Sequence, residues 1–334
     1  MMERKIELMK NGYDPFLDYL KGFCILSVVL NHCLGPLRSH VFFTYWGQLA
    51  VPLFLLLQSY HVFRKDYTGI SKAQIGKMLH RLFLPFACVT ALEFIIYLIF
   101  GNQSLIELTK STILSGGIGL GSYYMWIYLQ FFILAPLTYW FFRRFNISLY
   151  TGGGIFIFIC CVIEFIYCSI DMRYDLFRLS CLRYVFLIYL GYVWSRRGIR
   201  LNALTLLLSL VSIVFLTIFM YTDYNLEPVF HNFSWKYCHW ICYFYPAFLL
   251  MFILHWTYSI IPQRLKDLVA ILGHYSWHIM LLQMFFFAMF PKDLLPGIRS
   301  HYISLLLFCC LAFGFSTIPV IALHRIKAIN KTKI

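Results

Sequence analysis

The chain has 334 residues, of which 61% are hydrophobic and only 13% are charged. Soluble domains carry about 25% charged residues, so this composition excludes a protein whose whole surface faces water. The formal net charge of +14 would suit a nucleic-acid-binding protein, but the basic residues are spread over loops between long apolar runs, which argues against that class.

Apolar runs of about 20 residues recur along the chain, and each is long enough to cross a bilayer as a helix. We therefore expect an all-α, polytopic membrane protein with about ten transmembrane helices, folded as a single integral-membrane domain over residues 1–334. The predicted spans are Phe16–Leu34, Tyr45–Phe63, Leu82–Phe100, Tyr123–Phe142, Leu149–Ile170, Leu179–Ser195, Leu201–Thr222, Tyr237–Ile261, Leu268–Phe290 and Tyr302–Leu323.

The loops between these spans differ in charge from one side to the other. Nineteen of the 28 lysines and arginines fall in the loops of one side, seven fall in those of the other, and two lie within spans. Cytoplasmic loops carry such an excess, so we expect both termini in the cytoplasm. The first 14 residues lack the pattern of a cleavable signal, so the first span is expected to remain as an anchor. Anionic lipid headgroups are the expected partners of the basic loops, and nucleic acid is not.

The first predicted span contains ionisable residues in the stretch LDYLKGFCILSVVLNH. Asp18 and Lys21 lie near its start and His32 at its end. Lys21 and His32 are 11 positions apart, so on a helix they share one face at a separation of about 16 Å. Ionisable groups at that depth normally face a protein interior or a wet cavity. The face from Lys21 to His32 is therefore predicted to form one side of a site.

His32 is the strongest catalytic candidate, because a neutral imidazole accepts a proton from an attacking hydroxyl near neutral pH. The structural alternative is a histidine held by an interhelical hydrogen bond. Lys21 has an alternative of its own, since a lysine near a span end can extend to the cytoplasmic interface. The presence of Asp18, Lys21 and His32 on one span favours a site.

The cytoplasmic segment before the third span is short and strongly basic. Lys77 and Arg81 are four residues apart and share a helical face, where they would suit the phosphates of a nucleotide-like donor. The alternative is an ordinary basic cytoplasmic loop. On the outer side, a glycine-rich run follows Ser115, with the sequence SGGIGLG. It lacks the strand and helix of a nucleotide fold, so we expect a flexible loop.

The fourth span carries Trp126 and Gln130, an i, i+4 pair that would stack and hydrogen-bond on one face. Trp126 also suits the membrane interface. Glu93 and Glu164 lie inside apolar spans and need partners, for which Arg183 is a candidate.

The remaining polar positions allow both structural and functional interpretations. The second span ends in Gln58, Tyr60 and His61, and the ninth span carries Tyr275, Ser276, His278 and Gln283. Ser276 lacks the context of a nucleophile, so helix packing is favoured. Most of the 11 cysteines lie within apolar runs and none has zinc-site spacing, so no metal is expected.

Taken together, these stretches make the chain similar to the acyltransferase-3 family of integral-membrane acyltransferases, especially bacterial members that modify polysaccharides. The first span resembles the family's signature of an acidic residue, a basic residue followed by a small one, an apolar run and a histidine. Further resemblances follow in order along the chain: AVPLFLLLQSYHVF (50–63), KMLHRLFLPF (77–86), MWIYLQFFILAP (125–136) and LGHYSWHIMLLQ (272–283).

This resemblance implies transfer of an acyl group, most commonly acetyl, from acyl-CoA to a carbohydrate hydroxyl, in the cell inner membrane and without a metal. It implies that His32 matches the essential histidine and Lys21, beside Asp18, the paired basic position. The matched stretches suggest Lys77 and Arg81 as donor-binding residues and Trp126, Gln130 and Tyr275 as substrate-binding residues.

The chain departs from the family pattern at three places. Lysine stands at position 21 where arginine is frequent, and lysine does not make the same two-pronged contact. The family's Arg-x-x-Arg segment is reduced to Arg81, with Met78 three residues before it. Gln283 stands where a histidine is frequent.

The expected mechanism has acyl-CoA bound at the cytoplasmic face by Lys21, Lys77 and Arg81, with its thioester arm reaching His32. An acceptor, either a cell-surface carbohydrate or a lipid-linked glycan, approaches from the outer side. His32 acts as general base or carries the acyl group transiently.

Three other functions stay open. A transporter or flippase for a lipid-linked sugar also buries ionisable groups, but the sequence shows no inverted repeat or broken span. A sensor or assembly protein that uses the fold without chemistry is the second. A different histidine-dependent membrane acyltransferase lineage is the third, although its Asn-plus-His arrangement is not recognisable here. The acceptor, the acyl group and the oligomeric state are not fixed by the sequence.

Overall fold

A computed structural model describes residues 14–34, 44–65, 69–101, 104–170, 174–198, 200–221, 239–290 and 301–332. Within these ranges the chain forms helices joined by turns and short loops, and they contain no β-strand. The α-helices are α2 (Pro15–Cys33), α4 (Ala50–Arg64), α5 (Lys72–Met78), α6 (Leu84–Phe100), α7 (Leu105–Ser115), α8 (Tyr123–Arg144), α9 (Leu149–Ser169), α10 (Tyr174–Leu179), α11 (Phe186–Arg197), α12 (Ala203–Tyr221), α13 (Met251–Ile260), α14 (Gln263–His274), α15 (Ser276–Met289) and α16 (His301–Thr332). Short 3₁₀ or π-helical segments are η2 (Gly47–Leu49), η3 (Leu79–Phe83), η4 (Leu182–Tyr184), η6 (Trp240–Tyr243) and η7 (Tyr245–Leu250).

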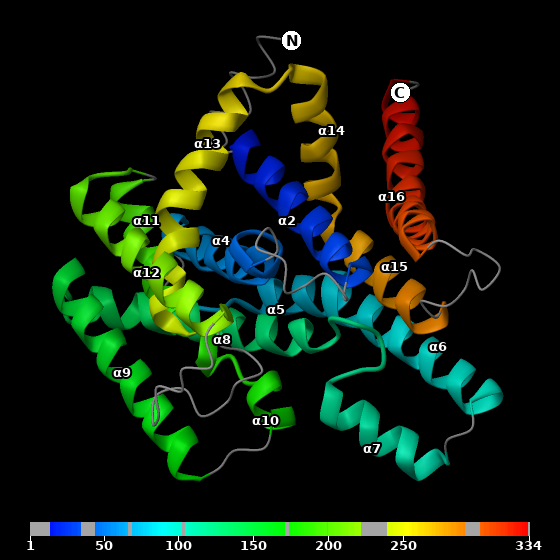
Figure 1. Cartoon of the computed structure of the whole chain (residues 1–334), viewed down its shortest axis with the longest axis horizontal. Helices are drawn as coiled ribbons and strands as arrows, with labels where there is room; N and C mark the ends of the chain where they lie inside the picture. The colour runs from blue at the N-terminus through cyan, green and yellow to red at the C-terminus, as the bar shows by residue number, and fades with distance from the viewer. Residues whose placement is uncertain are drawn as a thin grey trace.

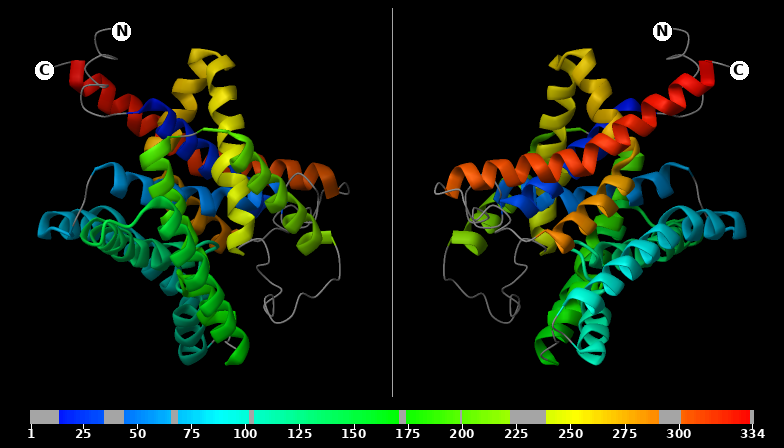
Figure 2. Two further views of the ribbon diagram at one scale, coloured as in Figure 1. Left: turned by 90° about the vertical axis from the view of Figure 1, so that its left-hand side faces the viewer. Right: turned by 90° about the vertical axis from the view of Figure 1, so that its right-hand side faces the viewer.

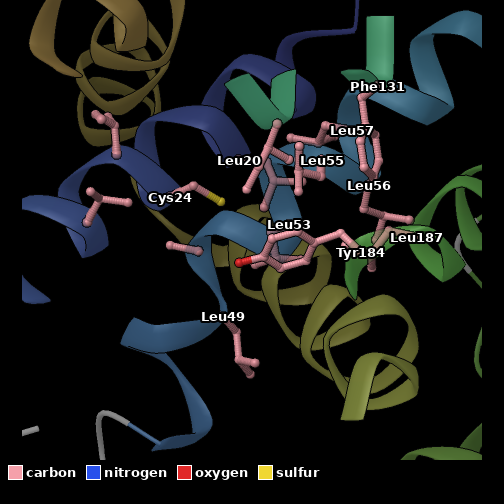
Figure 3. Close-up of a cluster of buried hydrophobic side chains, with 14 of the residues drawn as sticks. Leu20, Cys24, Leu49, Leu53, Leu55, Leu56, Leu57, Phe131, Tyr184 and Leu187 are labelled. Atoms are coloured by element: carbon pink, nitrogen blue, oxygen red, sulfur yellow. The ribbon is translucent and has the colours of Figure 1, made fainter. Parts of the chain in front are cut away.

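Helices α2 and α4 lie at the centre of the molecule (Figure 1). α2 begins after Asp14, whose carboxylate accepts a hydrogen bond from Phe16 N at 3.1 Å, with Pro15 in the first turn. It packs along α14 and against α4, and α4 packs against α11 and α8. Their contact forms the core in Figure 3, with Leu20 and Cys24 of α2 facing Leu53 of α4.

The helix that runs continuously from Lys72 to Phe100 lies at the periphery. In its apolar stretch 11% of the residues are buried inside the protein, against 67% in α2. Its outward side carries exposed Leu92, Ile95 and Ile99. Apolar side chains in such number on one helix fit contact with lipid.

All ten predicted spans contain helix, but fewer of them can cross a bilayer. Six helices in the described part of the chain are long and apolar enough, or seven if the bent pair α14–α15 is one span. α4 and α11 have 15 and 12 residues, which correspond to about 22 and 18 Å, short of the ~30 Å hydrocarbon core. The chain is thus an all-helical protein with several candidate membrane spans, and the number ten stays a prediction.

The predicted span Leu268–Phe290 is not one helix. α14 and α15 meet at Tyr275 with a bend of 70°. The first turns of α14 are polar, with exposed Arg264 and Asp267 and half-buried Lys266, and this end of the helix lies outside the apolar run. The expectation that no span is broken is therefore wrong.

The helix ends separate into two groups (Figures 1 and 2). The start of α2, the corner between α13 and α14 and the end of α16 lie toward one side, and the ends of α6 and α9 lie with the start of α7 toward the other. Which side faces the cytoplasm stays a prediction.

Candidate functional site

A cavity of about 510 Å³ lies between the central helices and the bend at Tyr275. This volume falls within the range of small-molecule sites. Its walls come from five parts of the chain: α2, α4, the α5–η3 segment, the start of α8 and the α14–α15 junction. Among its lining residues are Lys21, His32, Gln58, His61, Lys65, Lys77, Arg81, Gly121, Tyr124, Tyr128, Gly273, His274, Ser276 and Met280.

The predicted face of α2 lines this cavity. Lys21, Ile25, Val28 and His32 follow each other at spacings of four, three and four residues, and all four face the cavity. By helix geometry the two polar ends are about 16 Å apart, with apolar side chains between them. The prediction that Lys21 and His32 share a face is confirmed. Their chemical roles stay predictions.

Lys77 and Arg81 line the same cavity as Lys21. Ser71 starts their helix with a capping box, in which its hydroxyl accepts a hydrogen bond from Gln74 N at 3.2 Å and the Gln74 side chain accepts one from Ser71 N at 2.7 Å. Arg81 lies in the π-helical segment η3, a type of irregularity that is frequent at functional sites. Both cations are exposed, and they mark the end of the cavity that is reached from outside the protein.

Lys65 adds a further cation to this end, and the imidazole of His61 lies beside it. We call this end the basic mouth and define it as Lys21, His61, Lys65, Lys77 and Arg81. All five residues line the cavity, and no aspartate or glutamate of the described ranges does. Lys65 was not singled out from the sequence, and a structural or a functional role was left open for His61. Lys65 directly follows α4, four residues after His61. This spacing in the sequence could have indicated that the two residues share one face.

Asp18 lies beside the basic mouth and not within the cavity lining. It is buried, and its Oδ1 accepts a hydrogen bond from Lys21 Nζ at 2.9 Å. A buried carboxylate needs such a partner. Asp18 therefore orients Lys21, whose side chain is 28% exposed.

Two glycines bring α14 against α2 beside Lys21. A Cβ atom on Gly22 would lie 1.9 Å from Val269 O, and one on Gly273 would lie 1.7 Å from Asp18 O. The backbones therefore touch directly, which only glycine permits. This contact places His274 and Ser276, at the bend, in the wall opposite the basic residues of α5.

The glycine-rich run before α8 is packed at the other end of the cavity, beside His32. A Cβ atom on Gly121 would lie 3.4 Å from His32 Cε1 and 2.6 Å from Met280 Cε. The imidazole also packs edge-on against the ring of Phe287, with ring centroids 5.5 Å apart. Gly119 N donates a hydrogen bond to Glu93 Oε2 at 3.2 Å. The expectation of a flexible loop did not foresee this packing.

Trp126 and Gln130 do not line the cavity. Trp126 Nε1 donates to Gly116 O at 2.7 Å. Gln130 Nε2 donates to Leu179 O at 2.8 Å and to Trp126 O at 3.1 Å, and its Oε1 accepts from Cys181 N at 3.0 Å. Both side chains therefore form hydrogen bonds to the backbone of neighbouring segments and do not face the cavity.

Tyr275 likewise lies outside the cavity lining. It is buried at the bend and its ring contacts those of His274, His278 and His324, at centroid distances of 4.8, 5.7 and 5.9 Å. Lys327 Nζ lies 5.5 Å from its centroid. Tyr275 therefore joins the bend to α16, and its neighbours His274 and Ser276 are the ones that face the cavity.

Glu93, which is fully buried, and Glu164, whose side chain is 21% exposed, have partners that the sequence did not indicate. Glu164 Oε1 lies 2.5 Å from His239 Nε2, whereas Glu93 contacts the backbone of Gly119. Arg183 donates to Arg178 O at 3.0 Å and lies over the rings of Tyr123 and Tyr184. Gln283, at the position where the resemblance led us to expect histidine, donates to Met280 Sδ at 3.0 Å and so supports a residue that touches the cavity.

In the part of the chain that the structure covers, no group of three His, Cys, Asp or Glu side chains is placed to hold a metal ion. A family model described as an acyltransferase domain, acyltransferase-3, matches residues 14–325. No curated protein and no solved structure matches the chain significantly.

Proposed function

Because the chain belongs to the acyltransferase-3 family, we propose that it transfers an acyl group, acetyl in the first instance, from cytoplasmic acyl-CoA to a hydroxyl of a cell-surface or lipid-linked carbohydrate. The observation that carries this proposal is one cavity lined at one end by the basic mouth and at the other by His32. The cell inner membrane is the proposed location, with the basic mouth toward the cytoplasm.

The basic mouth supports the choice of donor. Phosphates are bound by lysine and arginine through charge-assisted hydrogen bonds. Lys21, Lys77 and Arg81 come from two separate helices and face one cavity, so they can surround a phosphorylated group. Between Lys21 and His32 the α2 wall is apolar, as Ile25 and Val28 occupy it. A thin, uncharged thioester arm suits this passage better than a nucleotide does.

His32 supports a general-base mechanism at the far end. The imidazole accepts the proton of the acceptor hydroxyl while the hydroxyl oxygen attacks the thioester carbonyl. Collapse of the tetrahedral intermediate breaks the C–S bond, and the imidazolium returns the proton to the leaving CoA sulfur. The products are the acyl ester and free CoA, and His32 regains its neutral form. Asp18 takes part indirectly, by orienting Lys21.

One observation favours a second function. The 70° break between α14 and α15 at the cavity is a feature of transporters, in which interrupted helices form the substrate site. The alternative is therefore a carrier of a lipid-linked sugar or polysaccharide. The family match and the cationic donor end favour acyl transfer.

The test uses purified protein in lipid nanodiscs, labelled acetyl-CoA and the glycan fraction of cells that lack this protein. The proposal expects label in the glycan and release of free CoA. Glycan that takes up no label with any acyl-CoA offered would contradict it. Reconstituted vesicles that move glycan in the absence of acyl-CoA would support the carrier instead.

A further inference from the structure

The glycine-rich run of residues 116–121 ends directly against the proposed catalytic base, with Gly121 beside His32. Four of these six residues are glycine, and Gly116, Gly117 and Gly121 have φ angles of +75°, +137° and +91°, which disfavour any other residue. At Gly121 the nearest part of His32 is Cε1, between the two imidazole nitrogens. The loop therefore limits the space from which another group can approach the imidazole.

Glu93 holds the middle of this loop. It is fully buried on α6, where a carboxylate is costly unless it makes polar contacts. Its Oε2 accepts the hydrogen bond of Gly119 N–H at 3.2 Å. Gly119 is wedged between this carboxylate and α15, because a Cβ on it would lie 2.8 Å from Glu93 Oε1 and 2.9 Å from Met284 O.

The loop is also held at its start, and the frame behind it is fixed. Trp126 Nε1 donates to Gly116 O at 2.7 Å, and Ser115 Oγ donates to Gly117 O at 2.8 Å. One turn beyond Glu93, Tyr97 donates through its hydroxyl to Ala288 O at 2.8 Å, which joins α6 to α15. Glu93 thus projects from a fixed pair of helices onto the middle of the loop.

We infer that residues 116–121 form the acceptor-side wall of the His32 site and that Glu93 is the positioning residue that holds this wall against the imidazole. The inference rests on the proposed function, in which the acceptor hydroxyl meets His32 at the end of the cavity remote from the basic mouth. A released loop should change the access to His32 and the proton-transfer step. Donor binding should stay unchanged, because its contacts lie about 16 Å away along α2.

The test compares Glu93→Leu, Glu93→Gln and the matched control Glu164→Leu. Both glutamates lie in apolar helices and both make one polar contact, but Glu164 contacts His239 and not the loop. Each purified protein in nanodiscs is treated with diethyl pyrocarbonate, and the carbethoxylation rate of His32 is followed by peptide mass spectrometry. Binding of acetyl-CoA is measured by calorimetry as a check on folding.

We expect Glu93→Leu to raise the His32 rate about tenfold, since losing a hydrogen bond to a buried acidic group favours local opening by that order. Glu93→Gln keeps an acceptor oxygen for Gly119 N–H and should stay within about twofold of the parent. Glu164→Leu should leave the rate unchanged. All three should bind acetyl-CoA as the parent does.

An unchanged His32 rate in Glu93→Leu would overturn the inference, and so would an equal rise in Glu164→Leu. If Glu93→Leu does not fold, Trp126→Phe takes its place, because it removes the hydrogen-bond donor to Gly116 O and keeps an aromatic ring. The inference then requires that Trp126→Phe raises the carbethoxylation rate of His32 about tenfold. Carbethoxylation needs no catalysis. An unchanged carbethoxylation rate would therefore overturn the inference about Glu93 and leave the proposed function standing. Absence of acyl transfer would reject the proposed function without altering the measured carbethoxylation rates.

Discussion

Gly273 lies with its Cα against the backbone of Asp18, so closely that a Cβ atom would approach Asp18 O to 1.7 Å. Gly22 forms the reciprocal contact with Val269. Because Lys21 lies between Asp18 and Gly22, the direct contact of α2 with α14 sets where the lysine enters the cavity. The small residue after the basic one in the first span thus has a packing reason.

Gly273→Ala should therefore destabilise the protein by about 1–3 kcal/mol, the range found when a packed interior is overfilled. The measurement is thermal unfolding in detergent. Gly154→Ala is the matched control, since Gly154 also lies in a helix and nothing is within 4 Å of its added Cβ. It should be neutral or slightly stabilising, because alanine favours helix over glycine. Equal stability of the two variants would contradict the close contact.

Lys77→Ala and Arg81→Ala should each weaken acetyl-CoA binding about fivefold, as expected for a partly exposed charge contact. Titration calorimetry at low and high salt gives the measurement, and the effect should shrink at high salt. Lys72→Ala removes a charge from the same helix α5 but outside the cavity. If Lys72→Ala weakens binding as much as the other two, the basic mouth has no special role.

Lys21 needs a test that separates donor binding from folding. Lys21→Ala leaves the buried Asp18 carboxylate without its 2.9 Å partner and should destabilise the protein by about 3 kcal/mol. Asp18→Asn combined with Lys21→Gln removes both charges and should fold better. This double variant should still lose acetyl-CoA affinity about tenfold, whereas Lys21→Arg should stay near the parent. Full affinity in the double variant would exclude Lys21 as a donor contact.

Gln130 is the residue at which structure and sequence suggest different experiments. Its three hydrogen bonds go to backbone of α8 and of the α10–η4 connection. Gln130→Ala should therefore lower the thermal unfolding midpoint while the Km for the glycan acceptor is unchanged. If Gln130→Ala kept the parent's stability and had a raised Km, the result would contradict a structural role and support the substrate contact predicted from the sequence.

The first span shows how far sequence alone can reach. The positions of Lys21 and His32 on one face follow from helical periodicity, which is a local property, and so does the common face of Lys77 and Arg81. The partners of these faces are not local. Lys65, directly after α4, and His274, beside the bend, line the same cavity. This depends on contacts between segments far apart in the chain.

Two features of the elements around the cavity were missed for the same reason. The run Gly116–Gly121 resembles a flexible loop in composition, but Glu93 and Trp126 from other helices fix it. The break at Tyr275 lies in a run apolar enough for one span, and the backbone contact at Gly273 accompanies the bend. Composition records neither contact.

The most direct test of the account is acylation of the glycan by a His32→Ala variant. Surface glycan is collected from cells that contain the parent, His32→Ala or no protein, and the mass of its acyl groups is measured beside acetyl-CoA binding of each purified protein. We predict that His32→Ala is inserted at the parent's level and binds acetyl-CoA normally, but leaves the glycan unacylated as in cells without the protein. Glycan acylated by His32→Ala at the parent's level would contradict the account.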